Sequence, residues 1–340
     1  MRLIDIESVE PGQYLGRTIF SANGTVLLAS GVQLTVYMIS TLKRLGVTTI
    51  YINDPNFLDV EPEDMLSDET KRAVIHQMSE AFEAIRSGKE FSSKAISQTV
   101  DQLLDDVMLN SGVMVQLSEI RTADNAAYVH AMNVCMISAV VGLEMGLNMV
   151  QMKELCIGAL LHDIGKINAP ALQEGRMHHA WRGFEIMKMK REYSLLSAHV
   201  AFQHHEAVDG SGVPRGISGE GIHMYAKIVA IANVYDNMLS PLDTDPPLMP
   251  HEACERLNAM SGMQLDHDVL VQFMKVVSTY PNGISVRLSN RKIGVVVGQH
   301  RGLPGRPIVR LLNKESEDSV EATEFDLAKH TTVFIEAVLS

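Results

Sequence analysis

The sequence predicts a mainly α protein, a helical bundle with a small α+β module before it and a small β appendage after it. Two observations predict this class: strand-like segments gather at the two ends of the chain, and apolar residues recur at helical spacing between them. The chain has 340 residues, 46% of them hydrophobic, so it can bury a sizeable core. We expect four segments, over residues 1–60, 61–110, 111–281 and 282–340.

The first segment is expected to form the α+β module. Two strand-like stretches, residues 18–20 and 25–28, flank Asn23-Gly24, a dipeptide typical of hairpin turns. The expected elements that follow are a helix capped by Thr35 and ended by Gly46, and a strand over 47–52. This module shows no catalytic constellation, so we do not expect the chemistry here.

The second segment is expected to be a linker followed by amphipathic helices. Acidic residues and prolines mark the stretch 55–68 as a linker, and residues 73–85 and 96–108 repeat apolar residues at helical spacing. Two alternatives stay open for these helices. They are either the first, core-facing helices of the bundle or a stalk through which the chain forms a homodimer.

The third segment continues the helical pattern, and the fourth changes character. From 125 to 280 few stretches suggest strands, so the bundle is expected here. After it, residues 285–288, 293–297 and 307–312 are strand-like and are separated by Gly and Pro. These strands predict the β appendage, in which nothing indicates chemistry.

Composition excludes several classes of function. The net charge of −12 argues against a DNA- or RNA-binding protein, because the nucleic-acid backbone is held by basic stripes. The three cysteines, Cys135, Cys156 and Cys254, have no disulfide or ligand spacing and fit a reducing compartment. We find no long uncharged apolar run and no basic-then-apolar leader, so we expect a cytoplasmic protein with no membrane partner.

The most informative pattern is a set of short motifs between Leu161 and Asp236. They are His162-Asp163-Ile164-Gly165-Lys166, His204-His205-Glu206, Asp209-Gly210-Ser211-Gly212-Val213-Pro214 and Ala232-Asn233-Val234-Tyr235-Asp236. Adjacent His-Asp and His-His pairs, in a chain with 13 histidines, supply the mixed imidazole and carboxylate donors that hold a pair of divalent metals. An apolar run over 155–161 is expected to deliver the first pair from a buried helix end.

In their order, these motifs resemble the HD-GYP family, metal-dependent hydrolases of the HD superfamily that cleave the bacterial second messenger cyclic di-GMP. The resemblance runs from about Asp124 to Tyr280 and implies an HD-type helical bundle, bacterial signal transduction, and cyclic di-GMP as the partner. It also implies two divalent ions, Fe, Mn or similar. The implied ligands of the first metal are His130, His162, Asp163 and, at the position of a family aspartate, Asn233, whereas Asp163 bridges to a second metal held by His179, His204 and His205.

The resemblance further implies roles near the scissile phosphate. Lys166 would offer a positive charge to a phosphate oxygen, and Asp124 would position a water or shuttle a proton, with Asp163 counted among the catalytic residues as the bridge. Two metals would lower the pKa of a bridging water and polarise the phosphoryl oxygens for an in-line attack. The implied substrate-binding residues are Lys166, Asp236, Gly212 and Pro214.

Several positions depart from the family pattern. Asn233 brings no charge where the family has a ligating aspartate, so the first metal site is expected to be weakened, with Asp236 as partial compensation. Val213 replaces the tyrosine of the family signature. A stretch over 240–247 with two acids stands where the family has arginines that grip the dinucleotide. Ala126 stands where members with a third metal have glutamate, so at most two metals are expected.

Three hypotheses follow from these observations. The first is a metal-dependent phosphodiesterase that hydrolyses cyclic di-GMP to pGpG, GMP or both. The second is a degenerate relative with weak or no activity that serves as a scaffold or binding module in cyclic di-GMP signalling. The third is a hydrolase of another phosphoester. His178 also stays open as a substitute for His179 as a ligand, because the spacing after Lys166 is shorter than the family's.

Overall fold

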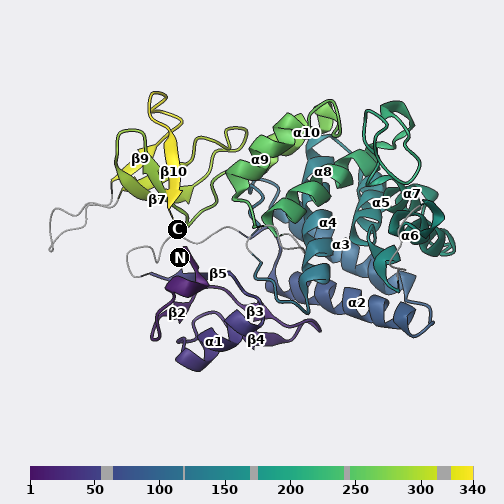
Figure 1. Cartoon of the computed structure of the whole chain (residues 1–340), viewed down its shortest axis with the longest axis horizontal. Helices are drawn as coiled ribbons and strands as arrows, with labels where there is room; N and C mark the ends of the chain where they lie inside the picture. The colour runs from purple at the N-terminus through teal and green to yellow at the C-terminus, as the bar shows by residue number, and fades with distance from the viewer. Residues whose placement is uncertain (55–63, 118, 169–174, 241–245, 312–322, 340) are drawn as a thin grey trace.

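The computed structural model describes residues 1–340 except 55–63, 118, 169–174, 241–245, 312–322 and 340. Figure 1 shows a helical bundle with the N-terminal module and the C-terminal sheet side by side at one end of it, where the two chain termini also lie. The backbone amide of Leu3 donates to the carbonyl of Gly283 at 3.2 Å, which joins the two small units directly. The predicted class, a mainly α helical bundle with β structure at both ends, is confirmed.

The N-terminal module combines a three-stranded sheet, a hairpin and one helix. Its elements are β1 (Arg2–Asp5), β2 (Tyr14–Leu15), β3 (Ile19–Phe20), β4 (Val26–Leu28), α1 (Val36–Arg44) and β5 (Thr49–Asn53). The sheet order is β1-β5-β2, antiparallel throughout, and β3 pairs with β4 across the predicted hairpin. Thr35 caps α1 as expected, since its hydroxyl accepts the Met38 amide at 3.2 Å, and Gly46 follows the helix with a φ of +83°.

The bundle begins earlier in the chain than the catalytic motifs suggest. Its elements are α2 (Asp68–Arg86), α3 (Ser93–Leu109), α4 (Ala126–Glu144), α5 (Met149–Leu160), η3 (Ile164–Lys166), η4 (Gly175–Met177), α6 (His179–Lys188), α7 (Leu195–Gln203), η5 (Gly219–Gly221), α8 (Met224–Leu239), α9 (Pro250–Ala259) and α10 (His267–Val276). Buried residues of α2 and α3 belong to the same hydrophobic core as those of α4 and α5. Of the two alternatives for α2 and α3, the packing favours core-facing helices of the bundle, and the homodimer stays a prediction.

At the centre of the bundle lies α4, which packs against α5 and α8 and also contacts α2, α3 and α10. By length and composition α4 could cross a membrane, which the expectation of no long apolar run had missed. However, 83% of its apolar window is buried inside the bundle. Its apolar composition on all sides is therefore explained by helices packing around it.

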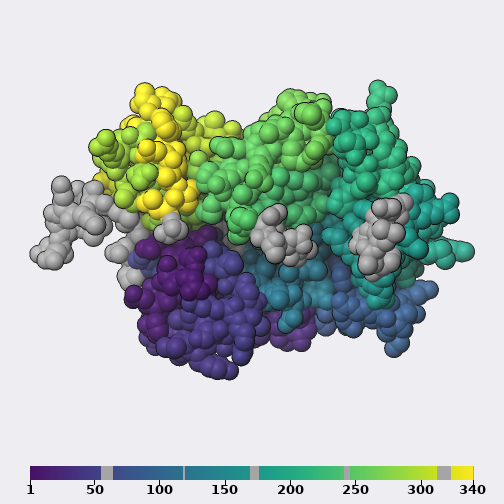
Figure 2. All heavy atoms as spheres, in the orientation of Figure 1, coloured from purple at the N-terminus to yellow at the C-terminus, as the bar shows by residue number. Residues whose placement is uncertain are grey.

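The C-terminal appendage is a five-stranded antiparallel sheet. Its strands are β6 (Ser285–Leu288), β7 (Ile293–Gly298), β8 (Ile308–Leu311), β9 (Glu324–Asp326) and β10 (Ile335–Leu339), in the order β10-β6-β7-β8-β9. The first three were predicted, whereas β9 and β10 were not. In the space-filling view, this sheet and the N-terminal module sit at the same end of the bundle, and the opposite end, formed by α6 and α7, lies away from both (Figure 2).

Close backbone contact brings α6 against the turn η3. A Cβ atom at Gly165 would lie 2.0 Å from the carbonyl oxygen of His179 and 2.5 Å from the amide nitrogen of Gly183. Neither backbone atom can move without shifting α6, so the absence of a side chain at Gly165 is a condition for placing His179 beside the His162-Asp163 pair.

We predict that Gly165→Ala destabilises the protein by at least the roughly 1–3 kcal/mol typical of an overpacked interior and displaces His179. Chemical unfolding, monitored by circular dichroism, measures the decrease in the free energy of unfolding. The matched control is Gly112→Ala, because a Cβ at Gly112 meets nothing within 4 Å. Equal stability of the two variants would contradict the packing role of Gly165.

Candidate metal centre

Four helices deliver the predicted ligands to one place in the bundle. His130 lies on the buried face of α4, and the His162-Asp163 pair follows the end of α5, as the apolar run predicted. His179 is the first residue of α6, and His204 and His205 follow the end of α7. The structure thus brings together side chains that are up to 75 positions apart in the chain, from 130 to 205.

One donor group consists of His130, His162 and Asp163. The Nε2 atoms of the two histidines are 3.2 Å apart, and they lie 3.6 Å and 3.5 Å, respectively, from Asp163 Oδ2. Ligands bonded to one ion at about 2.0–2.2 Å stand at such separations from one another. The three atoms therefore surround a position suited to a divalent ion.

A second donor group consists of Asp163, His179, His204 and His205. Asp163 Oδ1 lies 3.3 Å from His179 Nε2 and 3.5 Å from His204 Nε2. The Nε2 atom of His179 is 3.4 Å from that of His204 and 3.0 Å from that of His205. One carboxylate thus presents a different oxygen to each group, which is the arrangement that the bridging role of Asp163 requires.

Hydrogen bonding to the backbone sets which ring nitrogen faces the centre. The Nδ1 atoms of His162 and His204 lie 2.7 Å and 2.9 Å from the carbonyl oxygens of Ala159 and Ala201, so each donates through Nδ1. Their Nε2 atoms then carry lone pairs that point into the donor groups. Lone pairs crowded at this distance repel one another, and a cation between them removes the repulsion.

Burial keeps these imidazoles in the form that binds metal. It lowers the pKa of His162 to about 3 and holds the pKa of His205 well below its usual value. Burial by itself would raise the pKa of Asp163, but His162, the neighbouring histidines and Lys166 hold it well below its usual range. Asp163 Oδ1 is also buried without a hydrogen-bond partner. Neutral imidazoles, an ionised carboxylate and an unsatisfied oxygen together fit a divalent metal.

Asp236 contacts His130 inside the bundle. Its side chain is fully buried, and its Oδ2 lies 2.5 Å from His130 Nδ1. Its Oδ1 accepts from the Asn133 amide at 2.9 Å and pairs with Arg121. Burial by itself would raise the pKa of Asp236, but Arg121 and His130 lower it to about 2. Asp236 is thus buried with Arg121, Asn133 and His130 as its partners, and its carboxylate orients the ring of His130. The predicted contact of Asp236 with substrate stays a prediction.

Asn233 lies one turn before Asp236 on α8 and is also buried. Its side-chain oxygen accepts a hydrogen bond from the Asn237 amide at 2.9 Å. This oxygen keeps a second lone pair, but a neutral amide brings no negative charge to an ion. The first donor group therefore has one carboxylate, Asp163, and no ready replacement for the family's second one.

Three further predicted residues lie near the mouth of the centre or outside it. The Lys166 ammonium donates to Asp163 Oδ2 at 2.6 Å and its side chain is 39% exposed, so it stands between the centre and solvent. Asp124 is exposed in the turn that precedes α4. His178 caps α6 by accepting the Ala180 amide at 3.2 Å, which leaves His179 as the histidine of the second donor group.

The signature loop is fastened to the His204-His205 turn. The Val213 amide donates to the His205 carbonyl at 3.0 Å, and Glu206 accepts the amides of Arg215 and Ile217 at 3.0 Å and 3.1 Å. A Cβ at Gly212 would lie 2.2 Å from the Ala207 amide nitrogen. Gly212 thus has a packing role, whereas the predicted contacts of Gly212 and Pro214 with substrate stay predictions. The stretch 241–245, which includes the two acids that stand where the family has arginines, lies outside the described residues.

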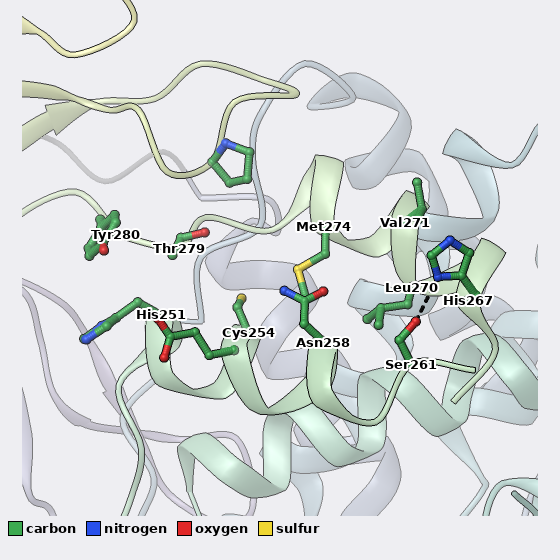
Figure 3. Close-up of a pocket in the computed structure, with 12 residues that line it drawn as sticks. His251, Cys254, Asn258, Ser261, His267, Leu270, Val271, Met274, Thr279 and Tyr280 are labelled. Carbon is green, nitrogen blue, oxygen red and sulfur yellow. Dashed lines mark hydrogen bonds between the residues drawn. The ribbon is translucent and has the colours of Figure 1, made fainter. Parts of the chain in front are cut away.

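Sequence reasoning missed two partners of the centre, Arg121 and Asn133. Both contact Asp236 across more than 100 positions of the chain, and neither was named among the candidate site residues. A surface cavity of about 430 Å³ between α9 and α10 lies apart from these residues (Figure 3). It is lined by residues such as His251, Asn258 and Tyr280 and by none of the candidate ligands.

Comparison with known proteins places this geometry in a family. Residues 114–269 match the family model of the HD domain, and residues 285–340 match that of a KOW domain associated with HD domains. The chain is 29% identical over 248 residues to a cyclic di-GMP phosphodiesterase of Pseudomonas aeruginosa, an alignment that covers 69% of this chain and 59% of the relative. It is 33% identical over 177 residues to a cyclic di-GMP phosphodiesterase of Thermotoga maritima, with 48% of each chain covered.

A solved structure of an HD-GYP-related protein from Bdellovibrio bacteriovorus matches 80% of this chain and 97% of its own, with 17% identity and a TM-score of 0.47. The chain spans only about half the length of the relatives named above, 59% and 48%. The central region of the chain matches an HD domain, and the region after it matches a KOW domain associated with HD domains. The resemblance inferred from the motifs is confirmed.

We predict that Asp163 matters more to metal retention than any single histidine, because its two oxygens face both donor groups. Elemental analysis of Asp163→Ala should show near-complete loss of metal. His130→Ala should retain the ion of the second group, since its four donors are untouched. A full metal complement in Asp163→Ala would show that the bridging assignment is wrong.

Proposed function

We propose that this chain is a metal-dependent phosphodiesterase that hydrolyses cyclic di-GMP to pGpG, GMP or both. The observation that carries the proposal is the pair of donor groups sharing Asp163, with Lys166 at their mouth. The names of the two bacterial relatives support cyclic di-GMP as the substrate. When bound, two divalent ions would supply a water of lowered pKa and polarised phosphoryl oxygens.

The residues of the chain have separate tasks in this proposal. The five imidazoles and Asp163 would hold the ions, and the backbone carbonyls behind His162 and His204 hold the rings in place. Lys166 provides a cation that is free to leave Asp163 for a phosphate oxygen of the substrate, because its side chain is partly exposed. Asp124, in the exposed turn before α4, is the proposed group for moving a proton.

The two donor groups are unequal. The second has four donor side chains, whereas the first has three, and the negative charge nearest to His130 is already paired with Arg121. We therefore propose that the second group binds its ion more tightly. Iron or manganese suits such mixed imidazole and carboxylate donors.

This inequality favours one alternative function. A chain that keeps only the ion of the second group would bind or respond to cyclic di-GMP without efficient turnover, as a scaffold in signalling. The observations that favour it are the engaged amide of Asn233 and the engaged carboxylate of Asp236. Hydrolysis of another phosphoester is the remaining alternative. It is supported by the same metal centre together with Val213, which replaces the tyrosine of the family's signature loop.

Metal content measured together with turnover tests the proposal. We expect the protein reconstituted with Mn²⁺ or, without oxygen, Fe²⁺ to bind two ions and to release pGpG or GMP from cyclic di-GMP. Lys166→Ala should lower turnover without lowering metal content, and Lys188→Ala, a lysine that pairs with Glu185 on the exposed face of α6, serves as the matched control. One ion or none, with binding but no cleavage, would support the scaffold. Cleavage only of other phosphoesters would support the third function.

We predict that Asn233→Asp tightens the first metal site. The change adds one negative charge to a donor group that has a single carboxylate, and a tenfold gain in affinity needs only about 1.4 kcal/mol. Metal titration with elemental analysis measures occupancy, and turnover of cyclic di-GMP should rise with it. Asn258→Asp, at an exposed position on α9 outside both donor groups, is the control for charge alone. If the unaltered protein already binds two ions tightly, the Asn233 oxygen is serving as a ligand and this prediction is wrong.

A further inference from the structure

The segment that leads into α4 is fastened to the N-terminal module. Ile120 packs against the hydrophobic core of that module. The Ala123 amide donates to the Leu45 carbonyl at 3.0 Å, and the Asn125 side-chain amide donates to the Phe20 carbonyl at 2.8 Å. Three residues of the stretch 120–125 are thus held by three different parts of the module.

A cluster of ion pairs with buried cations holds the start of the same segment. Glu119 accepts from Lys71 of α2 at 2.8 Å, and Lys71 also pairs with Asp64 at 3.1 Å. Asp64 in turn accepts from Arg17 of the N-terminal module at 2.6 Å. Arg17 and Lys71 are both buried, so this cluster ties the module, α2 and the segment together where solvent screens charges only weakly.

Arg121 lies between these anchors and contacts the metal centre. Its guanidinium pairs with Asp236 Oδ1, and Asp236 Oδ2 lies 2.5 Å from His130 Nδ1. The Arg121 side chain is 13% exposed and Asp236 is fully buried. A continuous set of contacts therefore runs from the N-terminal module through Arg121 and Asp236 to a candidate ligand of the first metal.

We propose that Arg121 is a positioning residue through which the N-terminal module holds Asp236, and thereby the ring of His130, in the orientation that the first metal requires; this rests on the metal centre proposed above. Ligands must be held to within about 0.5 Å for a site to bind well. The first donor group has only three donors, so the orientation of each weighs more there than in the second group.

Coupling of this kind is reciprocal. If the module orients His130 through Arg121, then an ion bound at His130 must in turn steady Arg121 and the segment that carries it. The second donor group has no such connection among the contacts described above. Ion binding is therefore expected to slow amide hydrogen exchange in the segment 120–125 only when Arg121 is present.

Hydrogen exchange measured by mass spectrometry, on the full chain freed of metal and then titrated with Mn²⁺, tests the proposal. In the unaltered protein, Mn²⁺ should slow exchange both in 120–125, which contains the bonded amide of Ala123, and around His204 and His205. In Arg121→Gln the protection of 120–125 should be lost and that around His204 and His205 kept. Arg121→Lys keeps the positive charge but lacks the planar guanidinium group. This variant should retain part of the protection of 120–125.

A matched control and a second variant complete the test. Arg301→Gln removes another arginine–carboxylate pair, with Glu144 on α4, and should keep both protections. Ile120→Ala loosens the segment without touching Asp236. It should weaken Mn²⁺ binding at the first site by less than the roughly tenfold expected for loss of a direct partner of a ligating histidine.

The outcomes separate this proposal from the proposed function. Unchanged protection of 120–125 in Arg121→Gln would overturn the positioning role while leaving the metal centre in place. If that variant does not fold, unchanged Mn²⁺ binding at the first site in Ile120→Ala would do the same. No metal-dependent protection anywhere in the unaltered protein would overturn the metal centre, and with it this proposal. If Arg301→Gln also loses the protection of 120–125, the cause is a general loosening of the bundle. This outcome would also overturn the positioning role of Arg121.

Discussion

The sharing of one largely buried carboxylate between two groups of imidazoles is the constraint on which this structure depends. Asp163 lies at a helix end with an oxygen directed to each group, and five histidines from four helices must reach it. Buried lone pairs and a buried negative charge are costly unless they are compensated. The tight packing of α6 against η3, and the backbone carbonyls behind His162 and His204, serve to hold donors that would otherwise repel one another or move apart.

Around this centre the chain shows two levels of support. The nearer level consists of groups that orient the ligands, such as the Asp236 carboxylate and the carbonyl of Ala159. The outer level consists of the elements that hold those groups, including the segment 120–125, which carries Arg121 and is fastened to the N-terminal module. The N-terminal module, which has no catalytic residues of its own, is in this way connected to the candidate metal centre. The signature loop is connected to the same centre through Glu206, which follows His205.

Much of the fold could be predicted from the sequence because its signals are local. The hairpin at Asn23-Gly24, the cap at Thr35 and the helix end before His162 each depend on neighbouring residues, and each was confirmed. The strands β9 and β10 were missed. The first has three residues, too few for an alternating pattern, and the second pairs with β6 some fifty positions earlier in the chain, a contact that no local pattern announces.

For the site, the sequence by itself determined which metal donors are available. The motifs and the family resemblance named the five histidines and Asp163. They also showed Asn233 at a position where a carboxylate was expected. Only the tertiary structure decided how those donors are used. Asp236 was expected near the substrate, yet it lies buried between His130 and Arg121. Motif spacing records which residues follow one another along a helix, whereas the partner of a buried charge is set by which distant segment packs beside it. Arg121 is 115 positions from Asp236, and that pairing exists only in the folded chain.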